Sequence, residues 1–195
     1  MKNKIKEYLS IPNILCYIRI VLVPVFLYVY FLANSSRDYI LAAIIIIVSS
    51  LTDFLDGYIA RHCDMITDFG KVIDPIADKL TQFSVAIALV FNYPLFWLLV
   101  IIIFLKDGMI LMVSLYLYGY GLKVKGASWW GKVSTAFFDV SVIILIGYYC
   151  PNTILSNSLI IISFILMLFS FIKYAKELSY YYTHRKEIKD EQERN

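Results

Sequence analysis

The sequence has little charge for its length. Of its 195 residues, 17% are Asp, Glu, Lys or Arg, whereas a soluble domain has about 25%. Cysteine is also scarce, and Cys16, Cys63 and Cys150 are too far apart for a CxxC motif or a disulfide framework. We interpret them as small apolar side chains. The sequence shows no repeat or low-complexity tract. These absences disfavour a water-soluble globule, a disordered tail and a nucleic-acid-binding protein.

Long apolar runs are present instead. The hydrophobic fraction is 60% and the mean hydropathy is +0.70. Because a membrane-spanning helix needs about 20 apolar residues, the chain has room for roughly six. Hydropathy places them at residues 11–32, 39–60, 71–91, 94–118, 132–149 and 154–174, with a polar turn at residues 34–38.

We therefore predict an all-α integral membrane protein with about six transmembrane helices. Residues 1–175 form the predicted membrane domain, and residues 176–195 form a charged cytoplasmic tail. Residues 3–10 are predicted to form a short interfacial helix, because Lys2, Lys4 and Lys6 precede the first apolar run and can lie near anionic headgroups.

The positions of the basic residues predict the orientation of the chain. If the N-terminus is cytoplasmic, fourteen of the 18 Lys and Arg residues fall on the cytoplasmic side, three lie within helices and only Arg37 falls outside. Basic loops are retained in the cytoplasm. An even number of spans places both termini there, so we predict a multi-pass protein of the cell membrane whose active site faces the cytoplasm.

Charged residues interrupt the apolar runs, where each costs roughly 2.5–3.5 kcal/mol at mid-bilayer. All lie in the cytoplasmic halves of their predicted helices, and the deepest are about 10–14 Å from the helix ends. This pattern predicts a polar cavity that opens to the cytoplasm. The alternative for the residues outside the four-aspartate group is salt bridging between helices. The charged residues are Arg19, Asp53, Asp56, Asp74, Asp78, Lys79, Lys106, Asp107 and Asp139.

Four of these aspartates are spaced to meet. Asp53 and Asp56 share one face of the second predicted helix, at i and i+3, and Asp74 and Asp78 share one face of the third, at i and i+4. A short loop joins the two helices, so the faces can come together. Because four carboxylates in one cavity repel one another, we expect divalent cations among them. Two metal ions bridged by carboxylates also suit phosphoryl chemistry.

Small residues and an arginine accompany the second helix. Gly57 and Ala60 lack bulky side chains where a ligand would approach the backbone, and Gly70 lets the third helix begin close to a ligand. Arg61, one turn after Gly57, can bind a phosphate as a planar fork. The alternatives are close helix packing for the glycines and a topology anchor for Arg61.

The chain resembles the CDP-alcohol phosphatidyltransferase family in a signature of eight fixed positions. The signature runs Asp53-x-x-Asp56-Gly57-x-x-Ala60-Arg61, eight residues, Gly70, three residues, Asp74, three residues, Asp78. The Ile11-Pro12-Asn13 start followed by Arg19, and the six predicted helices, also resemble this family. The resemblance covers roughly residues 11–174.

The resemblance implies a metal-dependent enzyme that transfers a phosphatidyl group from a CDP-linked lipid to an alcohol, releases CMP and is a homodimer. It implies that two Mg²⁺ or Mn²⁺ ions bind to the aspartates, and that Asp78 is also the general base. It further implies a CDP-lipid site. The implied metal ligands are Asp53, Asp56, Asp74 and Asp78, and the implied CDP-lipid residues are Asp53, Gly57, Ala60, Arg61, Gly70 and Asn13.

The flanking residues favour one acceptor over another. The stretch from Phe69 to Lys79 resembles phosphatidylglycerophosphate synthases, which use glycerol 3-phosphate, a dianion that needs cations nearby. Lys106-Asp107-Gly108 instead resembles the cardiolipin synthases of the family, which use phosphatidylglycerol. We favour glycerol 3-phosphate and keep phosphatidylglycerol as the alternative. A small ion-coupled transporter is the alternative of another class. The candidate acceptor-binding residues are Arg19, Lys79, Lys106 and Lys132, with Lys123 and Lys125 in the same loop region.

Overall fold

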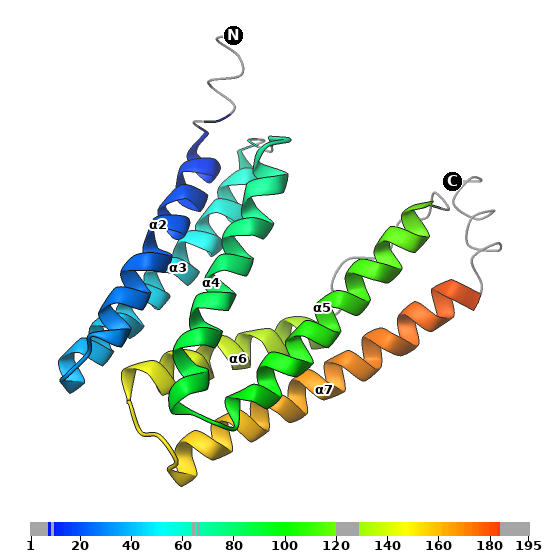
Figure 1. Ribbon diagram of the computed structural model, residues 1–195. Helices are drawn as coiled ribbons and strands as arrows, with labels where there is room; N and C mark the ends of the chain where they lie inside the picture. Colours follow the sequence, from blue (N-terminus) through cyan, green and yellow to red (C-terminus); the bar gives the residue numbers. More distant parts are fainter. Residues whose placement is uncertain (1–7, 9, 64, 66, 120–128, 184–195) are drawn as a thin grey trace. The chain divides into compact units, whose positions relative to one another are not determined.

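The computed structural model describes residues 8, 10–63, 65, 67–119 and 129–183. Within these residues the regular structure is helical, as predicted (Figure 1). Each of the six predicted segments corresponds to one helix, and the helix boundaries differ from the prediction by a few residues at most ends. The helices are α2 (Ile11–Phe31), α3 (Ser36–His62), α4 (Gly70–Asn92), α5 (Phe96–Gly119), α6 (Trp129–Gly147) and α7 (Ile154–Thr183).

The predicted polar turn at residues 34–38 is shorter than expected, because α3 begins at Ser36. The side chain of Asp38 caps the N-terminus of this helix. Its Oδ2 atom accepts hydrogen bonds from the backbone N–H groups of Asn34, at 3.0 Å, and Ser35, at 2.9 Å. Ser35 and Asp38 form a capping box, which satisfies N–H groups that the first turn of a helix leaves unpaired. Asp38 thus belongs to the helix rather than to the turn.

The chain divides into two compact units. The first comprises Met1–Tyr93 and Val142–Pro151, and the second comprises Pro94–Ser141 and Asn152–Asn195. In the first unit, α2 packs against both α3 and α4. Phe26, Ala42, Ala88 and Leu89 are fully buried there. The small alanine side chains let the helices approach one another closely, so α2 can present one face to two partners.

In the second unit, α5 packs against α7, and Phe96 of α5 lies with its ring centre 6.3 Å from that of Phe138 of α6. Buried serines recur every seven residues on α6 and α7, and we call them the serine seam. Its central hydrogen bond runs from Ser163 Oγ to Ser141 Oγ at 3.1 Å. Small hydroxyl side chains of this kind allow close helix packing in a membrane. The serine seam consists of Ser134, Ser141, Ser156, Ser163 and Ser170.

Four helical segments in the described part of the chain are long and apolar enough to cross a membrane. They are Ile11–Phe31, Ser36–His62, Trp129–Gly147 and Ile154–Lys176. Large apolar side chains such as Phe91 and Ile154 are exposed on the helices, and lipid can cover such surfaces. The protein is therefore a multi-pass membrane protein, whereas the predicted spans in α4 and α5 stay predictions.

The two ends of the chain are only partly described. The predicted interfacial helix at residues 3–10 falls mostly outside the described residues. At the other end, α7 continues to Thr183, so the predicted tail from residue 176 starts as an extension of the last helix. The division into a membrane domain and a tail stays a prediction.

Candidate functional site

Three helices of the first unit bring their charged side chains together. Asp53 and Asp56 come from α3, Asp74 and Asp78 from α4, and Arg19 from α2. The helical spacings predicted that each pair of aspartates would share a face, and the packing of α2 against α3 and α4 joins the two faces through Arg19. We call Asp53, Asp56, Asp74 and Asp78 the carboxylate cluster.

The guanidinium group of Arg19 pairs with all four carboxylates. Its Nη1 atom donates to Asp53 and Asp78, and its Nη2 atom donates to Asp56 and Asp74. The distance from Nη2 to Asp74 Oδ1 is 2.8 Å. The predicted alternative of salt bridging between helices thus describes the position of Arg19, and its role with an acceptor stays a prediction.

The carboxylate cluster has a closed side and an open side. The side chains of Arg19 and Asp56 are only 2% and 4% exposed, whereas those of Asp53, Asp74 and Asp78 are between 46% and 51% exposed. Buried charges need partners, and Arg19 and Asp56 have each other. The three half-exposed carboxylates can therefore receive a ligand from outside without disturbing the buried pair.

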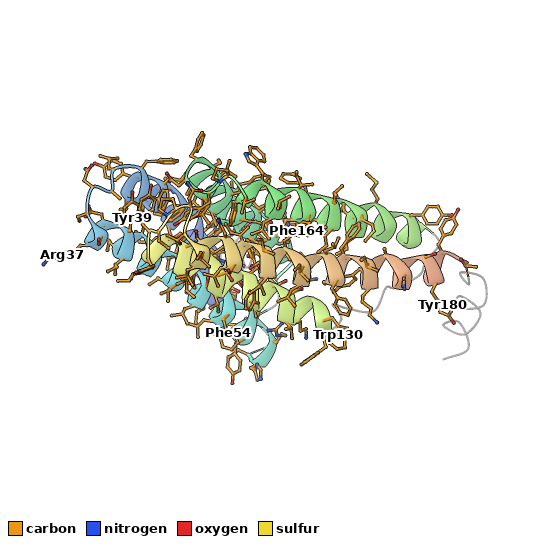
Figure 2. The ribbon with its side chains drawn as sticks, turned by 90° about the horizontal axis from the view of Figure 1, so that it is seen from below. Arg37, Tyr39, Phe54, Trp130, Phe164 and Tyr180 are labelled. Carbon is orange, nitrogen blue, oxygen red and sulfur yellow. The ribbon has the colours of Figure 1, made fainter. Side chains whose placement is uncertain are left out.

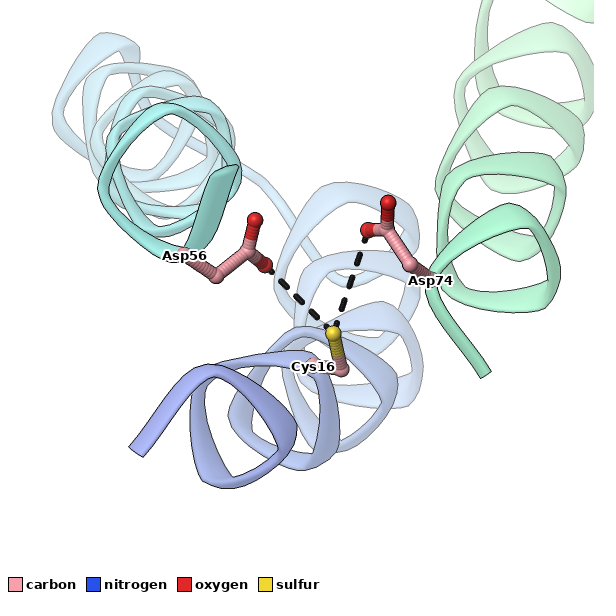
Figure 3. A group of neighbouring side chains, drawn as sticks. All are labelled: Cys16, Asp56 and Asp74. Carbon is pink, nitrogen blue, oxygen red and sulfur yellow. Dashed lines mark hydrogen bonds between the residues drawn. The ribbon is translucent and has the colours of Figure 1, made fainter. Parts of the chain in front are cut away.

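The side chain of Cys16 also belongs to this site, and the sequence did not predict it. Figure 3 shows the thiol between two carboxylates, with Sγ 3.4 Å from Asp56 Oδ2 and 3.8 Å from Asp74 Oδ1, so its single proton can be donated to either oxygen. Cys16 is one helical turn before Arg19, and Asn13 is one turn before Cys16. This i, i+3 series on α2 was the signal that could have identified the thiol.

Two overlapping groups among the described residues could hold a metal ion. One consists of Asp53, Asp74 and Asp78, and the other of Cys16, Asp56 and Asp74; within each group the ligand atoms lie within 4.8 Å of one another. Mg²⁺ prefers oxygen ligands, and Mn²⁺ accepts them readily, so the all-carboxylate group fits such ions. The group with a thiol is less typical of a hard cation.

Glycine at position 70 is explained by crowding at the start of α4. A Cβ atom there would lie 2.7 Å from Asn13 Oδ1 and 2.8 Å from Thr67 Oγ1. The hydroxyl of Thr67 accepts hydrogen bonds from the Gly70 backbone N–H, at 2.9 Å, and from Asn13 Nδ2, at 3.2 Å. The predicted ligand residues Asn13 and Gly70 are thus joined through Thr67, a residue that the sequence did not single out.

The other motif residues of α3 lie near its C-terminal end. A Cβ atom at Gly57 would lie 3.3 Å from Arg61 Nη2, so the glycine leaves room for the arginine side chain to lie along its own helix. Arg61 is exposed and Ala60 is half-buried. In the first turn of α4, the Lys71 ammonium donates a 2.7 Å hydrogen bond to Asp68 of the preceding loop, which holds the pKa of that carboxyl below its ordinary value.

The predicted acceptor residues belong to different units of the chain. Lys79 is exposed and its Nζ donates to Gln82 Oε1 at 3.1 Å. Lys106 and Lys132 belong to the second unit, where Lys106 Nζ lies 5.8 Å from the ring centre of Tyr174 and Lys132 is exposed. Lys123 and Lys125 lie outside the described residues. An acceptor role for any of these lysines stays a prediction.

Comparison with known proteins identifies the class to which this site belongs. The chain matches the CDP-alcohol phosphatidyltransferase family over residues 9–173. It therefore belongs to that family. The eight-position signature at the carboxylate cluster lies within the matched range.

Individual relatives bear names from one branch of the family. Proteins called CDP-diacylglycerol–glycerol-3-phosphate 3-phosphatidyltransferase are similar to this chain in several bacteria. The Rickettsia typhi protein is 44% identical over 80 residues, which are 41% of this chain and 44% of that protein. The Haemophilus influenzae protein is 33% identical over 129 residues, or 65% and 69% of the two chains. The Bacillus subtilis protein is 31% identical over 159 residues, or 75% and 81%. The chain thus spans less than half the length of the Rickettsia relative that it matches.

Proposed function

We propose that this protein transfers the phosphatidyl group of CDP-diacylglycerol to glycerol 3-phosphate and releases CMP, as a step of phospholipid biosynthesis. The observation that carries the proposal is the carboxylate cluster, in which three half-exposed aspartates lie beside a buried arginine and aspartate. Family membership supports the reaction type, and the names of the relatives support the donor and the acceptor.

The proposed reaction is a direct displacement at phosphorus. A hydroxyl oxygen of glycerol 3-phosphate attacks the phosphorus atom that carries the diacylglycerol. A new O–P bond forms while the bond from this phosphorus to the oxygen that bridges to CMP breaks. CMP leaves with the bridging oxygen. Asp78 accepts the proton of the attacking hydroxyl, and its half-exposed carboxylate is accessible for this role.

Asp53, Asp56, Asp74 and Asp78 are the residues that would hold two Mg²⁺ or Mn²⁺ ions. When bound, such ions neutralise the diphosphate oxygens and stabilise the leaving phosphate. The cluster supports this part of the proposal, because the oxygens of Asp53, Asp74 and Asp78 lie within 4.8 Å of one another. Cys16 places its thiol against the buried Asp56 and so limits the approach of ligands from that side.

The remaining motif residues are assigned to the CDP-lipid. We propose that Arg61 pairs with a phosphate through two parallel hydrogen bonds, and the exposure of its side chain supports this role. Gly57 and Ala60 leave space along α3, and Asn13 and Gly70 form one wall through Thr67. Lys79, Lys106 and Lys132 are assigned to the acceptor, whose phosphate carries the opposite charge.

We further propose that six spans place both termini and the carboxylate cluster on the cytoplasmic side of the cell membrane, and that the protein is a homodimer. The distribution of basic residues supports this orientation, because only Arg37 would fall on the outer side. A water-facing nucleotide and membrane-embedded acyl chains then match the two parts of the donor.

The test is CMP release from CDP-diacylglycerol by the purified protein with Mg²⁺, with glycerol 3-phosphate and phosphatidylglycerol offered in parallel. We expect release with glycerol 3-phosphate only. Release only with phosphatidylglycerol would indicate a cardiolipin synthase, consistent with Lys106-Asp107-Gly108. The absence of CMP release with these acceptors and with serine and inositol would contradict the proposed reaction and favour the transporter alternative.

A further inference from the structure

Arg19 occupies an unusual position for a buried cation. The whole residue is 1% exposed, and each of its two terminal nitrogens is shared between two carboxylates of the cluster. One positive charge therefore stands against four carboxyl groups. Divalent cations at the same carboxylates, as in the proposed function, would lie within a few ångströms of the guanidinium.

The contacts of Arg19 leave each carboxylate able to bind a second cation. Arg19 contacts one oxygen of each group, namely Asp53 Oδ1, Asp56 Oδ2, Asp74 Oδ1 and Asp78 Oδ1. A carboxylate has two oxygens and can accept on both. An ion and the arginine can thus share the carboxylates, but they then repel each other across a short distance.

A second observation concerns the remaining guanidinium nitrogen. The Nε atom of Arg19 is buried and has no hydrogen-bond partner among the described residues. A buried donor without a partner costs free energy. The side chain therefore gives up one hydrogen bond while its two terminal nitrogens reach four carboxylates, which indicates that its position is set by the cluster rather than by general packing.

We propose that Arg19 is a positioning residue that acts as the resident counter-ion of the metal site. It gathers the four carboxylates before metal ions bind, and its charge weakens the binding of those ions. This inference rests on the proposed function in one respect, which is that the carboxylate cluster binds divalent cations. It concerns how tightly they bind and what holds the site together without them.

The proposal predicts opposite effects on stability and on metal affinity. Replacement of Arg19 by a neutral residue leaves the carboxylates to repel one another, so the metal-free protein unfolds at a lower temperature. The same replacement removes a positive charge beside the ions, and a Coulomb interaction at about 5 Å predicts at least roughly tenfold tighter ion binding. A merely structural role would lower stability without tightening the binding of metal.

The experiment uses the full chain in detergent, stripped with EDTA and then titrated with Mn²⁺. Free Mn²⁺ is measured by electron paramagnetic resonance, and thermal unfolding is followed in parallel. The variants are Arg19→Gln and Arg19→Lys. Arg37→Gln is the matched control, because it removes the same charge from an exposed residue at the start of α3, whose side chain points away from the helices in Figure 2.

We expect Arg19→Gln to bind Mn²⁺ at least about tenfold more tightly than the wild type and to gain more thermal stability from it, with Arg37→Gln unchanged. Arg19→Lys keeps a charge but cannot reach four carboxylates, so its affinity falls between the two. If Arg19→Gln does not fold under any condition, the Mn²⁺ affinity of Arg19→Lys relative to the wild type tests the proposal instead.

Mn²⁺ binding that is unchanged or weaker in Arg19→Gln, or in Arg19→Lys where Arg19→Gln does not fold, would overturn the inference and leave the proposed function intact. If the wild-type protein and all of the variants fail to bind Mn²⁺, the metal dependence of the proposed function is overturned and the inference with it. The two failures are thus distinguishable.

Discussion

The two units of the chain bury polar groups of different kinds. Among the described residues, the first unit buries Arg19, Asp56 and Asn13 in addition to several hydroxyl side chains, whereas the polar residues buried in the second unit are the members of the serine seam. A serine hydroxyl can donate to a carbonyl of its own helix, as Ser141 does to Phe137 O at 2.8 Å and Ser134 to Gly131 O at 3.0 Å. Because such bonds form within one helix, a neutral hydroxyl can be buried where two helices pack without needing a partner on the second helix.

A buried charge cannot be satisfied in that way. Arg19 of α2 reaches carboxylates on α3 and α4, so its full set of ion pairs forms only where the three helices meet. Removal of one partner from such a network leaves an uncompensated charge. The eight-position signature and Arg19 lie on α2, α3 and α4 of the first unit, where we propose that the metal-dependent step takes place, while the serine seam serves the packing of the second unit.

The largest expected effect is on the carboxylate cluster itself. Asp53→Asn and Asp78→Asn each keep the shape of the side chain but remove a metal ligand or the proposed base, so we expect turnover to fall by at least about 100-fold. Asp68→Asn is the matched control, because this exposed loop residue pairs with Lys71 and lies outside the cluster. CMP release and the elution profile of the folded protein measure the two effects.

Near-normal turnover in Asp53→Asn or Asp78→Asn would separate the cluster from the chemistry. A loss of turnover in Asp68→Asn equal to that in Asp78→Asn would show that any lost carboxylate in this region has the same effect. Either result would contradict the proposed role of the carboxylate cluster, on which the comparison between the two units depends.

A smaller effect is expected from a single added methyl group. In Gly70→Ala the new Cβ meets Asn13 and Thr67 at under 3.0 Å, which displaces the start of α4 and the aspartates that follow. We expect turnover to fall by about tenfold. Gly108→Ala is the control in the second unit, because nothing lies within 4 Å of its Cβ position.

Gly108→Ala should keep its turnover and gain about 0.5–1 kcal/mol of stability, since alanine favours the helix over glycine. Turnover is measured as CMP release, and stability as thermal unfolding in detergent. Equal turnover in Gly70→Ala and Gly108→Ala would contradict the proposed importance of the Asn13–Thr67–Gly70 contact.

Arg61→Lys tests the assignment of Arg61, a residue of the first unit, to the CDP-lipid. Lysine keeps the positive charge but loses the planar pair of donors, so we expect KM for CDP-diacylglycerol to rise roughly fivefold with little change in kcat. Steady-state kinetics with varied donor lipid measure this change. An unchanged KM would leave Arg61 as a topology anchor only.

The smallest expected effect is in the serine seam. Ser163→Ala removes the 3.1 Å hydrogen bond to Ser141, but Ser141 keeps its bond to Phe137 O. We expect a loss of about 1 kcal/mol or less in the free energy of unfolding, with CMP release unchanged. A loss of turnover without a loss of stability would show that the serine seam contributes to the chemistry as well as to packing.

The sequence predicted the helices and the pairing of the aspartates because both depend on local spacing. A 3.6-residue period places Asp53 with Asp56 and Asp74 with Asp78 whatever the rest of the chain does. Thr67 and Cys16 were missed because their roles depend on which helices meet. Neither residue has a spacing relation to its partners on other helices. The i, i+3 series on α2 places Cys16 on the same helix face as Arg19, but it does not identify the aspartates that the thiol contacts.

The start of α3 and the position of Arg19 show two further limits. Residues 34–38 have the composition of a turn. The helix nevertheless begins at Ser36, because Asp38 accepts hydrogen bonds from the backbone N–H groups of Asn34 and Ser35. For Arg19 the sequence left open an acceptor role and a salt bridge. The contact with four carboxylates depends on the approach of α2 to both α3 and α4, which spacing along one helix does not define.

The central claim is that the carboxylate cluster performs metal-dependent transfer of the phosphatidyl group. The most direct measurement is CMP release from CDP-diacylglycerol with glycerol 3-phosphate, by protein stripped with EDTA and then titrated with Mg²⁺. We predict no release before Mg²⁺ is added and saturable recovery as it is added. Full release in the presence of excess EDTA would contradict the claim.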